Sequence, residues 1–159
     1  DYLYIFVVRE DKSVFPFQER FAMVKKETEQ FENVIVVSSG EFILSYTTMP
    51  LYFEKEEKKE EILDATNDLA IFGEYVAKEL GITKRFVGEE PSDLITRQYN
   101  EAMKKILPNY GVAAEEIKRF EVDKEVVSAS KIRKWMKEGE WEQIEKFGPA
   151  TVYERLRCR

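Results

Sequence analysis

Short apolar runs alternate along this chain with segments of helical periodicity, and this alternation limits the possible folds more than any other feature. The clearest runs are residues 2–8 (YLYIFVV) and 33–38 (NVIVVS), which lack the polar and apolar alternation of a half-exposed strand. Continuous apolar runs of this length are typical of strands buried on both faces of a parallel sheet. Two further segments, 84–88 (KRFVG) and 116–122 (EIKRFEV), predict shorter strands.

The segments around these runs predict helices. Residues 16–31 place apolar side chains three or four positions apart, and residues 64–80 do the same before Gly81, a typical helix stop. The other predicted helices cover 91–107, 128–137, 140–147 and 149–156. Strands that alternate with helices predict an α/β fold with a Rossmann-like parallel sheet flanked by helices, and a helical carboxyl-terminal end.

Two of the predicted helices should supply much of the core, because their apolar side chains recur on one face. The expected core residues are Leu69, Phe72, Val76, Leu80, Leu94, Ile95, Tyr99, Met103 and Ile106.

Length and composition favour a single domain over residues 1–159, since a chain of this size buries one core. The net charge of -6 disfavours binding to nucleic acid. No apolar run approaches the ~20 residues that a membrane-spanning helix needs. Cys158 is the single cysteine, so it has no disulfide partner, and we expect a reducing, cytoplasmic setting.

The start without methionine and the lack of histidine limit the reactions that this chain alone could catalyse. The chain begins inside an apolar run and without methionine, so we expect that a preceding segment, with the first strand of the sheet, is missing. The sequence contains no histidine, which removes the commonest general base and all imidazole metal ligands.

Ligands of parallel sheets bind where loops leave the carboxyl ends of the strands. Four such segments are candidates: REDKS (9–13), SGEFILSY (39–46), GEEPSD (88–93) and VVSASK (126–131). The charged run EKEEKKEE (54–61) is expected to be a solvated surface instead. The sequence has no Walker motif and no G-x-G-x-x-G, so a phosphate-binding loop of either kind is not expected.

The segment VVSASK predicts an anion-binding helix start. Ser128 is the expected N-cap, and Ser130, Lys131 and Arg133 follow within the first turns. Free N–H groups, two hydroxyls and two cations in this small volume would suit a di- or triphosphate. The alternative is an ordinary cap followed by a basic surface, although cations in a first turn oppose the helix dipole unless an anion compensates them.

The other loops leave alternatives open. Gly88 would let a ribose or base approach the backbone, and Glu89 and Glu90 would suit ribose hydroxyls or Mg²⁺, but the same residues also suit a polar turn before a helix. Arg9 and Lys12 follow the first strand and, by themselves, are better explained as surface charges.

The ordered motifs resemble a known family. VSASKIR is similar to the I-S-x-S/T-x-I/V-R signature of the nucleotidylyltransferase superfamily. The segments YLYIFVVREDKSVFPFQER, SGEFILS, DLAIFGEYVAKELGITKRFVGEEP, QYN and VSASKIRKW resemble, in this order, the carboxyl-terminal domain of citrate lyase ligases. The likeness covers nearly the whole chain.

The resemblance implies an enzyme that uses ATP, with Mg²⁺, and acetate to form acetyl adenylate with release of pyrophosphate. The acetyl group would then pass to the prosthetic-group thiol on the acyl-carrier subunit of citrate lyase. The phosphate-binding residues implied by the signature are Ser128, Ser130, Lys131 and Arg133, of which Lys131 and Arg133 would act in catalysis. Gly88 and Glu89 would face the nucleotide, and Arg9 would lie near the second substrate.

The chain departs from the family pattern in two ways. The H-x-G-H signature of the superfamily has no counterpart, so we expect this chain alone to be inactive or nearly so. Glu89 replaces a hydroxyl residue and Tyr46 an arginine, which permits a different acyl group or thiol. The alternatives are an adenylyltransferase acting on a phosphorylated small molecule and a non-catalytic nucleotide-binding module.

Overall fold

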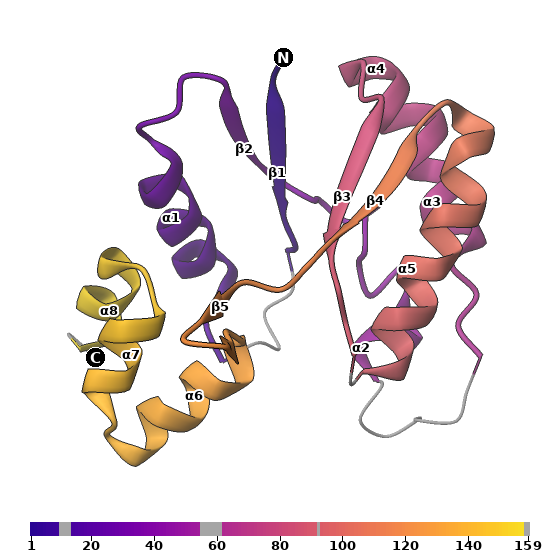
Figure 1. The fold of residues 1–159 in the computed structure, drawn as a ribbon. Helices are drawn as coiled ribbons and strands as arrows, with labels where there is room; N and C mark the ends of the chain where they lie inside the picture. Colours follow the sequence, from indigo (N-terminus) through magenta and orange to yellow (C-terminus); the bar gives the residue numbers. More distant parts are fainter. Residues whose placement is uncertain (10–13, 55–61, 92, 158–159) are drawn as a thin grey trace. The chain divides into compact units, whose positions relative to one another are not determined.

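The computed structural model describes residues 1–9, 14–54, 62–91 and 93–157 (Figure 1). Lys12, most of the charged run 54–61, Ser92 and Cys158 lie outside the described residues, so the predictions made for them stay open. The chain forms two compact units, each assembled from more than one segment. The first unit contains Asp1–Ile5, Gln18–Val36 and Arg119–Arg159, and the second contains Phe6–Phe17 and Val37–Lys118.

A parallel strand pair organises the second unit. Strands β3 (Lys84–Gly88) and β4 (Ala113–Ile117) pair in register from Lys84 opposite Ala113 to Gly88 opposite Ile117. The chain crosses from β3 to β4 through α5 (Leu94–Ile106) and the short 3₁₀ helix η2 (Leu107–Tyr110). This is a β-α-β unit, as the alternating sequence pattern predicts.

Helical segments before β3 complete the unit. They are α2 (Pro50–Phe53), α3 (Thr66–Ile71), the π-helical segment η1 (Phe72–Ala77) and α4 (Lys78–Leu80). The last three form one continuous helix over the predicted region, which ends at Gly81 with φ 64°. A left-handed residue at this position is a usual helix terminator, and glycine adopts it without a steric penalty.

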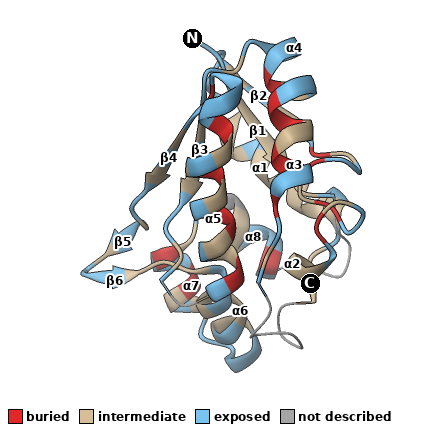
Figure 2. Ribbon diagram, turned by 90° about the vertical axis from the view of Figure 1, so that its right-hand side faces the viewer, coloured by how far each residue is buried: buried red, intermediate tan, exposed pale blue. Residues whose placement is uncertain are grey.

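The core of the second unit lies between these helices and the strand pair. Figure 2 shows buried residues along α3 and α5. The buried cluster consists of Ile43, Met49, Ala65, Leu69, Phe72, Ala77, Tyr99, Met103, Leu107 and Val112. Ile95 is also buried, whereas Val76 and Ile106 are partly buried against the cluster.

Two core predictions are wrong. Leu80 and Leu94 are 40% and 41% exposed. Both lie in terminal turns of their helices, where fewer neighbouring side chains surround a residue than in the middle turns. The helical period identified the correct face, but it does not indicate how far the packed part of that face extends.

A buried carboxylate connects the parts of the second unit. Asp68 has no exposed surface, and its Oδ1 accepts hydrogen bonds from the Leu44 N–H at 2.6 Å and from the Thr48 hydroxyl at 2.7 Å. Its Oδ2 accepts a hydrogen bond from the Tyr99 hydroxyl at 2.6 Å. The oxygen of that hydroxyl accepts a second hydrogen bond, from Nη2 of Arg85 at 3.2 Å. Burial raises the pKa of Tyr99. The network therefore links the turn after β2 to α3, α5 and β3.

Two strands near the start of the chain form a separate pair. β1 (Leu3–Val7) pairs with β2 (Val34–Ser38), and α1 (Phe17–Thr28) connects them. The Leu3 N–H donates to Asn33 O and the Ser39 N–H donates to Val7 O, so the bonds advance in the same direction along both strands.

The remaining elements belong to the first unit. They are β5 (Glu121–Val122), β6 (Glu125–Val126), α6 (Ala129–Glu138), α7 (Trp141–Phe147) and α8 (Ala150–Arg157). β5 and β6 pair in antiparallel orientation, and the three helices form the predicted helical end.

The structure confirms a mixed α/β architecture with parallel strands, but it differs from the expected sheet. Within the described residues the strands form three two-stranded sheets and no continuous sheet, and the Rossmann-like type stays a prediction. Leu3 and Ile35 are 42% and 37% exposed, so full burial of their strands is wrong, because a two-stranded sheet offers little area for helices to cover. No helix in the described segments is long and apolar enough to cross a bilayer.

We predict that Asp68→Asn lowers the free energy of unfolding by about 3 kcal/mol, because the amide cannot accept all three hydrogen bonds and leaves a buried donor without its acceptor. Chemical denaturation of the purified chain measures this. Asp64→Asn is the matched control: Asp64 is exposed and accepts the Thr66 N–H, a bond that asparagine can also accept. Equal losses in the two variants would contradict the role given to Asp68.

Candidate functional site

A tight hairpin leads into the predicted anion-binding helix. The sequence pattern predicts one strand over 116–122, but the chain leaves β4 at Ile117 and forms the hairpin β5–β6 instead. Asp123 and Lys124, the two residues of its turn, have φ values of 52° and 68°. Two consecutive left-handed residues are the geometry of a type I′ turn, which matches the twist of an antiparallel pair. The periodicity of the sequence did not reveal this turn.

The hairpin ends directly before the N-cap of α6. Ser128 has extended backbone angles, φ −143° and ψ 147°, and its Oγ accepts the N–H of Lys131 at 3.2 Å. The predicted N-cap is therefore confirmed. The Ser130 hydroxyl lies 3.0 Å from the Ser128 hydroxyl and is exposed. Two hydroxyls thus lie together at the end of the helix that carries free N–H groups.

The two cations of this helix start are in different environments. Lys131 pairs with Glu125 of β6, with Nζ 2.7 Å from Oε1. The half-buried Arg133 makes no ion pair with another described residue. The first turn carries no acidic residue, although a carboxylate there would be favourable. Glu125 therefore compensates the charge of Lys131, whereas no carboxylate of a described residue compensates the charge of Arg133.

Helix α7 packs against α6. The rings of Trp135 and Phe147 pack with their centroids 5.1 Å apart. Nζ of Lys146 on α7 lies 2.7 Å from the carboxylate of Asp123 in the hairpin turn. These contacts join α6 to α7 and α7 to the hairpin turn, although the exposed ion pair adds little to stability.

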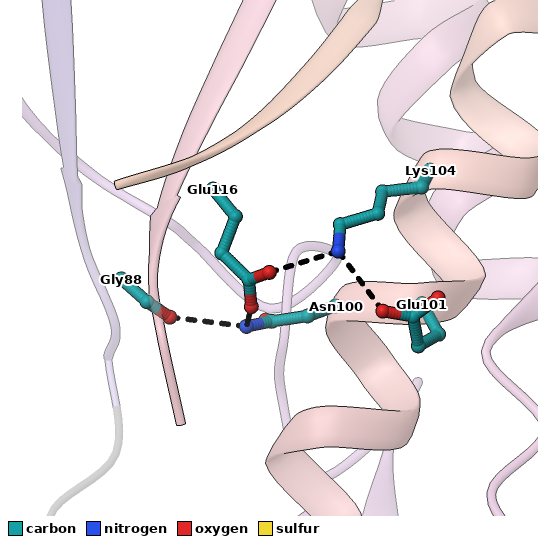
Figure 3. Close-up of polar contacts among 5 residues, drawn as sticks. All are labelled: Gly88, Asn100, Glu101, Lys104 and Glu116. Atoms are coloured by element: carbon teal, nitrogen blue, oxygen red, sulfur yellow. Dashed lines mark hydrogen bonds and ion pairs between the residues drawn. The ribbon is translucent and has the colours of Figure 1, made fainter. Parts of the chain in front are cut away.

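The loop residues Gly88 and Glu89 lie at the carboxyl end of β3, in the second unit. The Glu89 N–H donates to Ile117 O at 2.9 Å, which extends the ladder between β3 and β4 by one bond. The carbonyl of Gly88 accepts Nδ2 of Asn100 at 3.0 Å (Figure 3). A methyl group on Gly88 would meet no described residue within 4 Å other than the two chain neighbours, so this side of the loop is open among the described residues.

Two carboxylates of this loop, those of Glu90 and Asp93, accept hydrogen bonds from backbone N–H groups. Oε1 of Glu90 accepts the N–H of Asp93 at 3.1 Å, and Asp93 in turn caps α5 by accepting the Thr96 N–H at 2.8 Å. In the described part of the chain, no group of three or more Asp, Glu, Cys or His side chains could hold a metal ion. Mg²⁺ often binds through substrate phosphates and only one or two carboxylates, so the expectation of Mg²⁺ stays a prediction.

Arg9 lies after β1 in the second unit. Its N–H donates to the Ser39 hydroxyl at 3.1 Å, and its side chain is exposed. The bond joins the loop after β1 to the start of SGEFILSY, the segment that follows β2.

The structure thus brings Ser128, Ser130 and Lys131 together at one helix start, with Arg133 further along that helix. Gly88 and Glu89 share one loop, and Arg9 contacts Ser39; these groups belong to the second unit. The roles of all seven residues stay predictions.

Three polar residues near these groups were not singled out from the sequence. Glu125 pairs with Lys131, and Asn100 and Glu116 adjoin Gly88. Asn100 lies in the QYN segment that supported the family resemblance, but a surface and a buried asparagine look alike in a single sequence.

The fold and the helix start define a mixed α/β protein with a hydroxyl-rich, basic helix start at the end of a hairpin. The family model of the citrate lyase ligase C-terminal domain matches residues 1–156. The chain belongs to this family.

Three curated relatives are similar over almost the whole chain, and each is named citrate (pro-3S)-lyase ligase. The relative from Escherichia coli is 35% identical over 98% of this chain, that from Haemophilus influenzae 34% over 98%, and that from Klebsiella pneumoniae 33% over 94%. The aligned regions are 46%, 48% and 45% of those proteins, so the chain spans about half the length of the relatives it matches. No solved structure gave a significant match.

We predict that Ser128→Ala lowers the free energy of unfolding by about 1 kcal/mol, because the Lys131 N–H loses its acceptor. Ser130→Ala removes a neighbouring, exposed hydroxyl that accepts no backbone N–H of a described residue, so its loss should stay below about 0.5 kcal/mol. Urea denaturation of both variants checks the difference. A larger loss for Ser130→Ala would show that Ser128 is not the stabilising cap.

Proposed function

We propose that this chain is part of an ATP-dependent acetate ligase that activates citrate lyase. The observation that carries the proposal is its membership of the citrate lyase ligase family over residues 1–156. The names of the three relatives support citrate lyase as the target. The geometry at the start of α6 supports the use of a phosphorylated substrate.

The proposed reaction has two steps. An acetate oxygen attacks the α-phosphorus of ATP, the bond to the β-phosphate oxygen breaks, and acetyl adenylate and pyrophosphate form. The thiol of the prosthetic group on the acyl-carrier subunit then attacks the acetyl carbon. The thiol gives up its proton to solvent, the thioester bond forms, and the bond between the acetyl carbon and the phosphate oxygen breaks, so that AMP leaves.

The residues of α6 would act electrostatically in the first step. Negative charge grows on the leaving pyrophosphate, and preorganised donors that face this charge lower the barrier. Ser128, Ser130 and Lys131 offer hydroxyl, N–H and ammonium donors, and Arg133 adds a guanidinium that makes no ion pair with another described residue. Guanidinium groups bind phosphate oxygens through two parallel hydrogen bonds. Mg²⁺ would accompany the triphosphate and share its charge.

The remaining candidates would position the substrates. The open side of Gly88 would allow a ribose or base to approach, with Glu89 as a hydrogen-bond acceptor for ribose hydroxyls. Arg9 would lie near the second substrate, acetate or the thiol-bearing group.

Glu125 would have to release Lys131 when phosphates bind. The Lys131–Glu125 pair is half-exposed, with 38% and 48% of the two side chains accessible, so its net contribution to stability is small. A phosphate carries more negative charge than one carboxylate and can replace it at low cost. Glu125 would thus hold the lysine in place until ATP binds.

The test is acetate-dependent exchange of labelled pyrophosphate into ATP by the full-length protein that contains this chain. We expect exchange that requires acetate, followed by thioester formation on the acyl-carrier subunit of citrate lyase. Lack of exchange with any short carboxylate would overturn the proposal. A stable adenylylated product without a thioester would select an adenylyltransferase instead, and ATP binding without any reaction would select a non-catalytic module.

We predict that Arg133→Ala and Lys131→Ala each weaken ATP binding to the full-length protein by about 1 to 3 kcal/mol, since each removes a charge-assisted contact. Lys134→Ala is the matched control, because it removes the same charge from the same helix, from an exposed residue 3.9 Å from Glu138. Glu125→Gln should bind ATP at least as tightly as the unmodified protein, because Lys131 is then freed. Calorimetry measures all four. Equal effects of Arg133→Ala and Lys134→Ala would point to net charge alone.

A further inference from the structure

A buried amide lies at the carboxyl ends of β3 and β4. Asn100 on α5 is 3% exposed, and its Nδ2 donates to Gly88 O at 3.0 Å and to Oε1 of Glu116 at 2.9 Å (Figure 3). Both partners are acceptors, so only the NH₂ end of the amide fits between them. Both amide hydrogens are therefore used, one on each strand.

Glu116, the second partner of the amide, is itself paired with a lysine. Nζ of Lys104 lies 2.8 Å from Oε2 of Glu116 and 2.9 Å from Oε1 of Glu101. The hydrogen bonds from Lys104 and Asn100 lower the pKa of Glu116, so this carboxylate is ionised at neutral pH. An ionised Glu116 accepts from both neighbours at once, and Asn100 cannot rotate without losing a charge-assisted bond.

Asn100 holds the peptide group between Gly88 and Glu89. The Gly88 carbonyl and the Glu89 N–H belong to the same planar peptide. The N–H donates to Ile117 O at 2.9 Å and the carbonyl accepts from Asn100, so both polar groups, which point in opposite directions within the peptide plane, are held. Glycine has the widest backbone freedom of all residues, so without Asn100 only the bond from the Glu89 N–H to Ile117 O would oppose rotation of this peptide.

The orientation of this peptide determines which backbone face of the loop is exposed to a ligand. A methyl group on Gly88 would meet nothing within 4 Å, so the glycine is not required by packing against the described residues. An open backbone face, held rigid by a buried amide, is suited to a planar or ring-shaped group that must approach closely. A buried amide is costly unless it is hydrogen-bonded, and the two bonds of Nδ2 of Asn100 meet that condition.

We propose that Asn100 is a positioning residue for the nucleoside part of ATP: it fixes the Gly88–Glu89 peptide so that the open side of Gly88 receives the ribose or base. This inference rests on the proposed ATP-dependent function. Asn100 acts through the peptide and does not touch the reacting atoms. Its loss should affect ATP and not acetate.

The experiment compares Asn100→Leu with Lys104→Met in the full-length protein. Both variants break the same network, but Lys104→Met leaves the bond between Asn100 and Gly88 O intact. In the exchange assay we expect Asn100→Leu to raise the KM for ATP about tenfold, as for one lost hydrogen bond, with the KM for acetate unchanged. Lys104→Met should change neither KM more than about twofold. If Asn100→Leu does not fold, Asn100→Ser takes its place with the same expectation.

A second readout follows the peptide itself. Hydrogen exchange of the Glu89 N–H should become about tenfold faster in the Asn100 variant and stay unchanged in Lys104→Met. Equal shifts of the KM for ATP in the two variants, or unchanged exchange of Glu89, would overturn the inference and leave the proposed function intact. An unmodified protein that shows no ATP-dependent exchange would overturn both.

Discussion

The second unit depends on one buried carboxylate. Asp68 is fully enclosed and accepts the Leu44 N–H, the Thr48 hydroxyl and the Tyr99 hydroxyl. Leu44 has a φ of 45°, a left-handed conformation that is unfavourable for leucine, and its bond to Asp68 helps to maintain it. Since Tyr99 also contacts Arg85, the same carboxylate is connected to a cation on β3. Turn, helices and strand are thereby held in one arrangement.

A similar device operates at the carboxyl end of the parallel pair. Asn100 connects Gly88 of β3 to Glu116 of β4, and Lys104 completes the network from α5. In one place a buried polar side chain of a covering helix fixes the turn that follows β2, and in the other it fixes the last residue of β3. Ligands of parallel α/β proteins bind at the carboxyl ends of the strands, so these two hydrogen-bond networks fix the backbone in the region where a substrate would bind.

The start of α6 combines features of different origin. The cap by Ser128 is local, because it depends on residues three positions apart. The pairing of Lys131 with Glu125 depends on the hairpin, which brings a residue six positions earlier against the helix. The hairpin turn contains Lys124 with a φ of 68°, a conformation that periodicity does not predict. The sequence therefore identified the helix and its cations, but it did not identify the carboxylate that accompanies them.

The sequence by itself determined the alternation of strands and helices, the N-cap at Ser128, the stop at Gly81 and the family, because these depend on spacing and residue type within short segments. Only the tertiary structure decided that Leu80 and Leu94 lie outside the core, that β5 and β6 form a hairpin, and that Asp68 and Asn100 are buried. Burial of a polar side chain depends on partners that lie far away in the chain, such as Asp68 and Tyr99, 31 residues apart. No local pattern encodes such a pairing, since it exists only when distant segments pack together.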